Sequence, residues 1–243
     1  MNIKDKSYVQ LVNGRYGPCY TFRRDEYLGR SVFSYGEYNK DECEHIVRLA
    51  NEKKGLVLDI GANIGNISQA LISAGHYVIA FEPQPEVFEL LKLNCPGART
   101  YNVGLGSLNT IMQIPKLDYS KRGNYGAISI GTGIGLDVEV KTLDSFNFEN
   151  VSLIKIDVEG FEEEVLLGGE LTILNSKPII YLEADRLEKL PSLAKKLNSM
   201  GYKYTPHNPP LFNPDNFFKN RTNIWRKDFY SLNWECRPVN CGN

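Results

Sequence analysis

The stretch GLVLDIGANIGN, residues 55–66, contains an apolar run, a carboxylate and a glycine-rich turn in that order. The apolar run predicts a buried strand over residues 55–60, and the residues from Ile64 to Ala74 have the spacing of an amphipathic helix. A strand that passes through a glycine turn into a helix leaves free backbone N–H groups at the start of the helix, and these groups bind anionic ligands. The stretch therefore predicts a ligand site at the end of a buried strand.

Strands and helices alternate along most of the remaining chain. Apolar runs and helical spacing predict strands over residues 76–82, 99–105, 152–158, 178–183 and 202–205, and helices over 40–52, from Pro85, over 162–174 and over 187–200. This alternation predicts an α/β fold in which helices cover both faces of a parallel sheet. Ligands of such sheets bind beyond the carboxyl ends of the strands, so the polar residues there are the candidates for function.

The ends of the chain and its long loops depart from this pattern. Residues 1–54 predict a helix and short strands over 8–12, 20–23 and 31–34, with a hairpin turn at Asn13-Gly14. We expect this part to pack on the core and to cover the ligand site. Residues 55–243 form the predicted main domain, with a last strand near Asn223 to Arg226. Its loops near 107–140, rich in Gly, and near 206–220, rich in Asn and Pro, are the expected substrate loops.

The composition excludes several classes of protein. The 28 Lys and Arg against 29 Asp and Glu give a formal net charge of −1, which provides no broad positive field for nucleic acid. The apolar runs are too short to span a bilayer and the N-terminal MNIKDKSYVQ lacks the apolar core of a signal peptide, so we expect a cytoplasmic protein without a membrane span. The five cysteines and three histidines show no metal-binding spacing. We expect reduced thiols, and a Cys236–Cys241 bridge is the one exception left open.

The first two strand ends supply groups for a nucleoside that carries an amino acid. Asp59 ends the first strand, where its carboxylate suits an ammonium group, and Gly61 lets the backbone approach a ligand closely. Glu82 follows the second strand, about 20 residues after Gly61, where a carboxylate can accept both hydroxyls of a ribose. Pro83 is next to it and can form one wall of a pocket for an adenine ring. S-adenosylmethionine combines a ribose, an amino group and a carboxylate, and it is the predicted cofactor. The alternative is a glycine turn needed only for packing and a solvated glutamate.

The later strand ends carry the candidates for catalysis. Asp157 and Glu159 alternate in the motif KIDVEG, so both face one side, where carboxylates would stabilise a sulfonium cation and one could accept the proton of an attacking hydroxyl. Asp157 could instead only cap the helix that follows. Glu183 ends the fifth strand, His207 lies beyond the sixth, and Tyr35 could cover the cation with its ring. The candidate catalytic residues are therefore Asp157, Glu159, Glu183 and His207.

Together these motifs resemble those of the FkbM-type S-adenosylmethionine-dependent methyltransferases. The matching segments are YGEYNKDE (35–42), LDIGANIGNIS (58–68), AFEPQPEVFELLKLN (80–94), NVGLGS (102–107), VKTLDSF (140–146), LIKIDVEGFEEEVLLGG (153–169), PIIYLEAD (178–185), GYKY (201–204) and TNIW (222–225). The resemblance implies a class I methyltransferase fold, Rossmann-like, with a seven-stranded sheet whose last strand, near residues 223–226, runs antiparallel beside residues 202–205. It also implies O-methylation of a hydroxyl, often on a sugar or natural product, so the expected partner is a small-molecule or glycan acceptor.

The expected cofactor-binding residues lie within these matching segments. They are Tyr35, Glu37, Asp59, Gly61, Ala62, Asn63, Gly65, Asn66, Ser68, Glu82, Pro83, Asn102, Val103 and Asp157. No residue is assigned to a metal. Two other functions are considered. A nicotinamide-dependent oxidoreductase is disfavoured because the G-x-G-x-x-G pattern fails at Asn63 and Asn66, and because Asp59 would repel a pyrophosphate. The other is a non-catalytic binding module with a methyltransferase fold.

Overall fold

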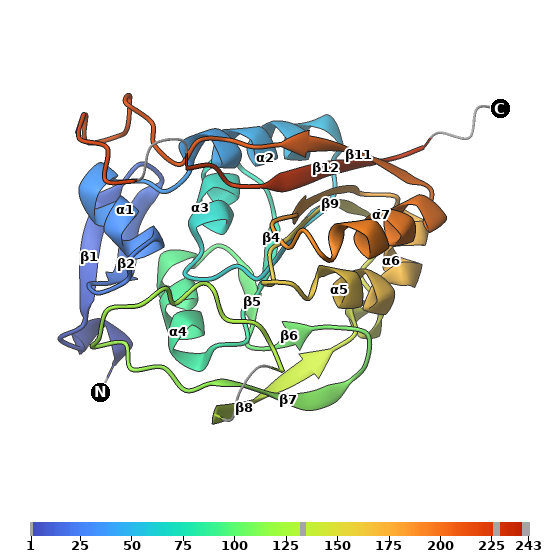
Figure 1. Ribbon diagram of the computed structural model, residues 1–243, viewed down its shortest axis with the longest axis horizontal. Coiled ribbons are helices and arrows are strands. Elements are labelled where there is room, and N and C mark those ends of the chain that lie inside the picture. The colour runs from blue at the N-terminus through green and yellow to red at the C-terminus, as the bar shows by residue number, and fades with distance from the viewer. Residues whose placement is uncertain (1, 132–134, 226–228, 240–243) are drawn as a thin grey trace.

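The main sheet of the computed structural model has seven strands. The structure describes residues 2–131, 135–225 and 229–239. The strands lie in the order β11 (Tyr202–His207), β12 (Asn233–Pro238), β10 (Ile179–Glu183), β9 (Val151–Ile156), β3 (Leu56–Ile60), β4 (Val78–Phe81) and β5 (Arg99–Tyr101) (Figure 1). β12 runs antiparallel to β10 and β11, and the other neighbours are parallel. The predicted α/β class and the seven-stranded sheet with an antiparallel last strand are confirmed.

Helices cover both faces of this sheet. α2 (Lys40–Glu52), α3 (Asn66–Ser73) and α4 (Pro85–Asn94) lie on one face, and α5 (Glu162–Gly168), α6 (Glu170–Ser176) and α7 (Leu190–Ser199) lie on the other (Figure 1). Val57 and Val78 belong to the buried cluster under the first set of helices, whereas Leu58 and Ile79 belong to the cluster under the second. Because both faces of the central strands are buried, their sequences are continuous apolar runs instead of alternations.

Smaller elements precede and follow the first βα units. The 3-10 helix η1 (Ile3–Asp5), the hairpin of β1 (Val9–Gly14) and β2 (Gly17–Phe22), and helix α1 (Leu28–Tyr35) come before α2. A second sheet of β6 (Gly104–Leu105), β8 (Gly135–Lys141) and β7 (Thr110–Pro115) contains the two ends of the expected loop 107–140, and η2 (Leu143–Phe146) follows it. Figure 1 shows these two groups on different sides of the main sheet. In the part of the chain that the structure describes, no helix is long and apolar enough to cross a membrane.

Three local predictions in the N-terminal half are wrong. The hairpin turn lies between Gly14 and Gly17, which pair with each other, and not at Asn13-Gly14. Residues 31–34 belong to α1 and not to a strand, because the buried residues of this segment recur at helical spacing. The strand predicted over residues 99–105 is divided between two sheets, since β5 pairs with β4 and β6 pairs with β8.

Two predictions in the C-terminal half also need correction. The helix predicted over 162–174 is two helices that meet at Gly168 and Gly169, where a Cβ on Gly168 would lie 1.9 Å from the Gly106 carbonyl oxygen. Residues 223–225 form no strand, and Arg226 lies outside the described residues. The inserted antiparallel strand is β12, because Trp234 and Cys236 enter the core there. Cys236 is a free buried thiol, and Cys241, its suggested partner, lies outside the described residues.

Candidate active site

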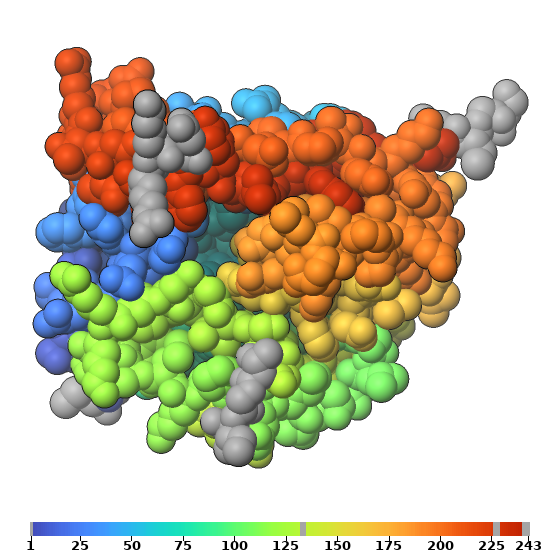
Figure 2. Space-filling model, viewed as in Figure 1, coloured from blue at the N-terminus to red at the C-terminus, as the bar shows by residue number. Residues whose placement is uncertain are grey.

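A cavity of about 550 Å³ opens beyond the carboxyl ends of β3, β4, β9 and β10. The strand order reverses between β3 and β9, which is where α/β sheets bind their ligands. Figure 2 shows the hollow between the blue N-terminal part, the green segment and the orange segment of the chain. Most expected cofactor residues line it, namely Gly61, Ala62, Asn63, Asn66, Glu82, Pro83, Val103 and Asp157, as do the expected catalytic residues Glu159 and Glu183.

Gly61 brings the ends of β3 and β9 together at the base of the cavity. Its N–H donates to the carbonyl of Phe81 at 3.0 Å, and the N–H of Asp157 donates to the carbonyl of Ile60 at 3.0 Å. Gly61 has a φ of +74°, and a Cβ there would lie 1.8 Å from the carbonyl oxygen of Asp157. Only glycine fits this turn, which leaves bare backbone facing the ligand space.

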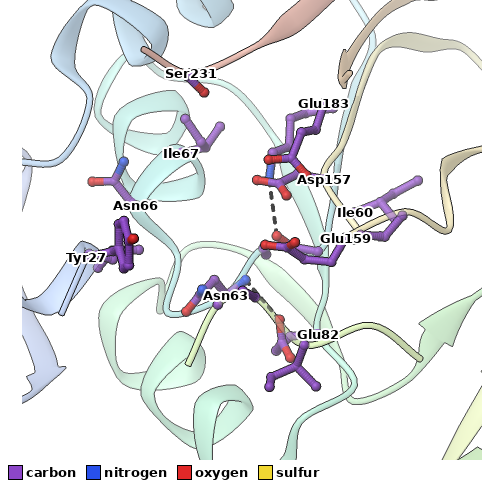
Figure 3. Close-up of a pocket in the computed structure, with 18 of the residues that line it drawn as sticks. Tyr27, Ile60, Asn63, Asn66, Ile67, Glu82, Asp157, Glu159, Glu183 and Ser231 are labelled. Atoms are coloured by element: carbon purple, nitrogen blue, oxygen red, sulfur yellow. Dashed lines mark hydrogen bonds and ion pairs between the residues drawn. The ribbon is translucent and has the colours of Figure 1, made fainter. Parts of the chain in front are cut away.

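Glu82 is fixed at the other end of the cavity by two backbone donors. The N–H of Asn63 donates to its Oε2 at 3.0 Å and the N–H of Gln84 to its Oε1 at 2.8 Å (Figure 3). An ionised carboxylate has about four acceptor positions, so two remain for the hydroxyls of a ribose. Burial raises the pKa of Glu82 to about 7, against the lowering effect of the two N–H groups. The residues present thus fit the ribose of the cofactor.

Lys155 is a candidate that the sequence pattern did not single out. It lies in β9 with a side chain that is 5% exposed, and its Nζ is 3.4 Å from both Asp59 Oδ1 and Asp157 Oδ2. It also donates to the Gly61 carbonyl at 3.1 Å. Burial alone would lower the pKa of Lys155, but the two carboxylates raise it overall. The sequence signal that could have identified it is a single Lys within the apolar strand LIKI. A buried lysine needs a partner of opposite charge, such as Asp59.

Asp157, Glu159 and Glu183 form a cluster of carboxylates on one side of the cavity (Figure 3). One oxygen of each lies within 4.8 Å of the others, close enough to share a cation. Glu159 has a φ of +54° and is paired with Arg186, whereas Glu183 Oε2 is buried without a hydrogen-bond partner in the described part of the chain. Burial and the charge of Asp157 raise the pKa of Glu159 to about 7 and that of Glu183 to about 11.

The N-terminal part of the chain also lines the cavity. Tyr27 and Leu28 come from the start of α1, Tyr38 and Asn39 precede α2, and Glu42 lies in its first turn. Burial and the charge of Asp157 raise the pKa of Glu42 to about 7. Glu42 was missed because helical periodicity alone does not show that an acidic residue at a helix start is buried. The covering role of residues 1–54 and the boundary at residue 55 both stay predictions.

Several expected residues support the cavity without lining it. Asp59 is fully buried and accepts from Ser68 Oγ at 2.6 Å, so it holds Lys155 and does not face the ligand space. Gly65 caps α3, with Cys95 behind it. The amide of Asn102 donates to the carbonyls of Glu82 and Pro83, which fixes the loop that carries them.

Three further residues lie outside the cavity. The Tyr35 ring is buried beside Phe212, and its hydroxyl donates to the carbonyl of Thr222, so it covers no cation there. Glu37 is paired with Arg15 at 2.5 Å. His207 stacks on His45 at 3.9 Å between ring centroids, and its Nδ1 is 2.8 Å from the hydroxyl of Tyr181. Each side chain is already occupied by its neighbours, which sequence spacing could not show.

The raised pKa values predict how stability depends on pH. Glu42, Glu82, Glu159 and Glu183 keep a proton in the folded protein above the usual glutamate pKa of 4.5, so the unfolded chain binds fewer protons. The free energy of unfolding should therefore fall as pH rises, for three of them up to about pH 7 and for Glu183 up to about pH 11. Each such group contributes a slope of about 1.4 kcal/mol per pH unit. Calorimetric melting between pH 5 and 9 checks this, and Glu183→Gln should flatten the decline above pH 7; a wild-type melting temperature that rises over this range contradicts it.

The strand order, the glycine turn after β3 and the acidic residue after β4 define a class I S-adenosylmethionine-dependent methyltransferase. The sequence model of the methyltransferase FkbM domain matches residues 59–204, and the chain belongs to this family. Its cofactor is S-adenosyl-L-methionine, as the resemblance implied.

The chain is also similar to individual methyltransferases. The chain is 28% identical to the methyltransferase sdnD of Sordaria araneosa, over 56% of this chain and 68% of that protein. The solved structure of methyltransferase FkbM from Methylobacillus flagellatus KT aligns with a TM-score of 0.52 and 18% identity, over 75% of this chain. This chain spans 43% of the length of that one, so the likeness shows the fold.

Proposed function

We propose that this chain methylates a hydroxyl group of a small-molecule or glycan acceptor. The observation that supports this best is the position of the carboxylate cluster of Asp157, Glu159 and Glu183 in the same cavity as Glu82 (Figure 3). Glu82 would hold the ribose, and the turn at Gly61 would face the amino-acid part of the cofactor with bare backbone. The acceptor would then enter beside the cluster, over the end of β10 and the segment before β12.

S-adenosylmethionine supplies a methyl group on a cationic sulfur. The carboxylates of the cluster would attract this positive charge and orient the acceptor oxygen, and orientation alone can contribute roughly 7–11 kcal/mol to such a reaction. Asp157 is the proposed proton acceptor, since its side chain is 40% exposed towards the cavity and Lys155 fixes it from behind. A base of this kind contributes about 10²–10⁴-fold.

The two other functions fit the structure less well. A pyrophosphate at the turn after β3 would meet Asp157 in this cavity, whereas anion sites for dinucleotides leave a helix N-terminus free of carboxylates. A non-catalytic module would have no need for a partly exposed carboxylate fixed by a buried lysine. Detection of a labelled methyl group on a hydroxyl of the product, in a screen of acceptors, tests the proposal. Methylation confined to nitrogen or carbon contradicts it.

The role of Glu82 gives a second test. Glu82→Ala removes the acceptor for the ribose and should weaken S-adenosylmethionine binding by about 1.5–3 kcal/mol, or roughly 10- to 150-fold, as measured by calorimetry. Glu89→Ala is the matched control, since Glu89 lies on α4 in an exposed ion pair with Lys92 outside the cavity. NAD should bind neither protein. A folded Glu82→Ala variant with unchanged affinity would show that this carboxylate does not contact the cofactor.

A further inference from the structure

The charged side chains of the cavity are unbalanced. Six carboxylates line it, from Glu42, Glu82, Asp157, Glu159, Glu183 and Asp185. Among the described residues the cationic side chains that line it are Lys155 and Arg186. Lys155 is paired with Asp59 and Asp157, and Arg186 with Glu159 and Asp185. The cavity therefore offers no unpaired cation to an acidic acceptor.

Glu183 is the least compensated of these carboxyl groups, and with no countercharge beside it in the described part of the chain the group keeps its proton at pH 7. Its Oε2 is shielded from solvent and finds no donor among the described residues. The groups that approach it in the cluster, Asp157 and Glu159, are carboxylates, and the guanidinium of Arg186 bonds to Glu159. The sulfonium of the cofactor would bring one positive charge to a cluster of three carboxylates, while its ammonium would lie with the amino-acid part at the Gly61 turn. A second cationic group is needed before all three can be ionised together.

An apolar surface adjoins Glu183. The N–H of Ala184 donates to the carbonyl of Leu232 at 2.8 Å, and Glu183 is in register with Asn233, so the segment before β12 lies against the end of β10. Leu232 and Phe229 line the cavity and remain 38% and 37% exposed. Figure 3 shows Ser231 of this segment on the same side of the cavity as Glu183. An apolar skeleton can thus rest next to an uncompensated carboxylate.

We propose that the acceptor is an amphiphilic amine, which holds its ammonium group at Glu183, its apolar skeleton on Leu232 and Phe229, and its hydroxyl near Asp157. This inference rests on the proposed function, because it concerns the acceptor part of the same cavity. An ammonium group supplies both the missing positive charge and the missing hydrogen-bond donor to Glu183. An acceptor with a carboxylate or phosphate at this place would face carboxylates and is excluded.

Three phenols that differ in charge test the proposal: tyramine, N-acetyltyramine and 4-hydroxyphenylacetate. Each is titrated by calorimetry into the protein saturated with S-adenosylhomocysteine. We expect tyramine to bind at least about 10-fold more tightly than N-acetyltyramine, and the anion to bind most weakly. Equal binding of the three, or a preference for the neutral or anionic phenol, overturns the proposal. The binding of S-adenosylhomocysteine is measured first, so that failure of the proposed function is seen separately.

Variants test whether Glu183 is the residue that causes the preference for an ammonium group. Glu183→Gln should abolish the preference for tyramine over N-acetyltyramine, and Glu188→Gln, an exposed carboxylate outside the cavity, should retain it. The melting temperature of each variant shows that it is folded. A titration with Mg²⁺ or Mn²⁺ tests the other source of positive charge. A divalent ion that binds wild type tightly, is lost in Glu183→Gln and removes the tyramine preference assigns the cluster to a metal and overturns the amine.

Discussion

Lys155→Met should lower the free energy of unfolding by about 3–5 kcal/mol at pH 7, the range found when one partner of a buried ion pair is removed. Lys155 is 5% exposed and is the countercharge for Asp59, which is fully buried. Met fills a similar volume but leaves the buried Asp59 without its countercharge, and among the described residues the Ser68 hydroxyl is then the one side-chain donor to it. Denaturant unfolding followed by circular dichroism measures the change.

The partner residue supplies the control for this prediction. In the double variant Lys155→Met/Asp59→Asn no buried charge remains unpaired at this position, so much of the lost stability should return. If Lys155→Met is as stable as wild type at pH 7, then Lys155 and Asp59 do not form the electrostatic support of the site.

The sheet could be predicted because its signals are local. The apolar run before Asp59, the glycine turn and the apolar run before Asp157 each predict a strand and its end from neighbouring residues. Parallel strands then bring their carboxyl ends to one edge, which placed Glu82, Asp157 and Glu183 in one cavity without further information. The last strand was misplaced because β12 lies between β11 and β10, so its position depends on pairing with both of these strands and not on a local signal.

The errors in the site have a different origin. Tyr35 and His207 were chosen for their chemistry at positions near strand and helix ends, but each is held by residues distant in the chain, Thr222 and His45. Asp59 was expected to face the ligand because it ends a strand, and its side chain instead turns to Ser68 on α3. Such partners follow from tertiary packing, so spacing in the sequence cannot reveal them.

Asp157→Asn should lower turnover by about 10²-fold or more while S-adenosylmethionine still binds. The N–H of Asp157 still bonds to the carbonyl of Ile60, which keeps the fold of the turn, and an amide occupies the same volume. The amide cannot accept a proton from the acceptor hydroxyl. This proton becomes far more acidic as the oxygen forms its bond to carbon, so a carboxylate can accept it late in the reaction. Single-turnover rates with the best acceptor from the screen, together with calorimetry of cofactor binding, measure the two effects.

His207→Ala is the matched control, because His207 was the competing candidate base and lies outside the cavity, stacked on His45. We expect it to change turnover by no more than about 2-fold, since it removes no group that reaches the acceptor. Glu159→Gln tests whether the neighbouring carboxylate could be the base instead. Because Glu159 is paired with Arg186, this substitution should affect the binding of the ligands more than turnover. If Asp157→Asn turns over normally and His207→Ala is inactive, the proton leaves by another route and the cavity must rearrange to bring His207 to the acceptor. Asp157 would then act only by joining β9 to β3 and by holding Lys155.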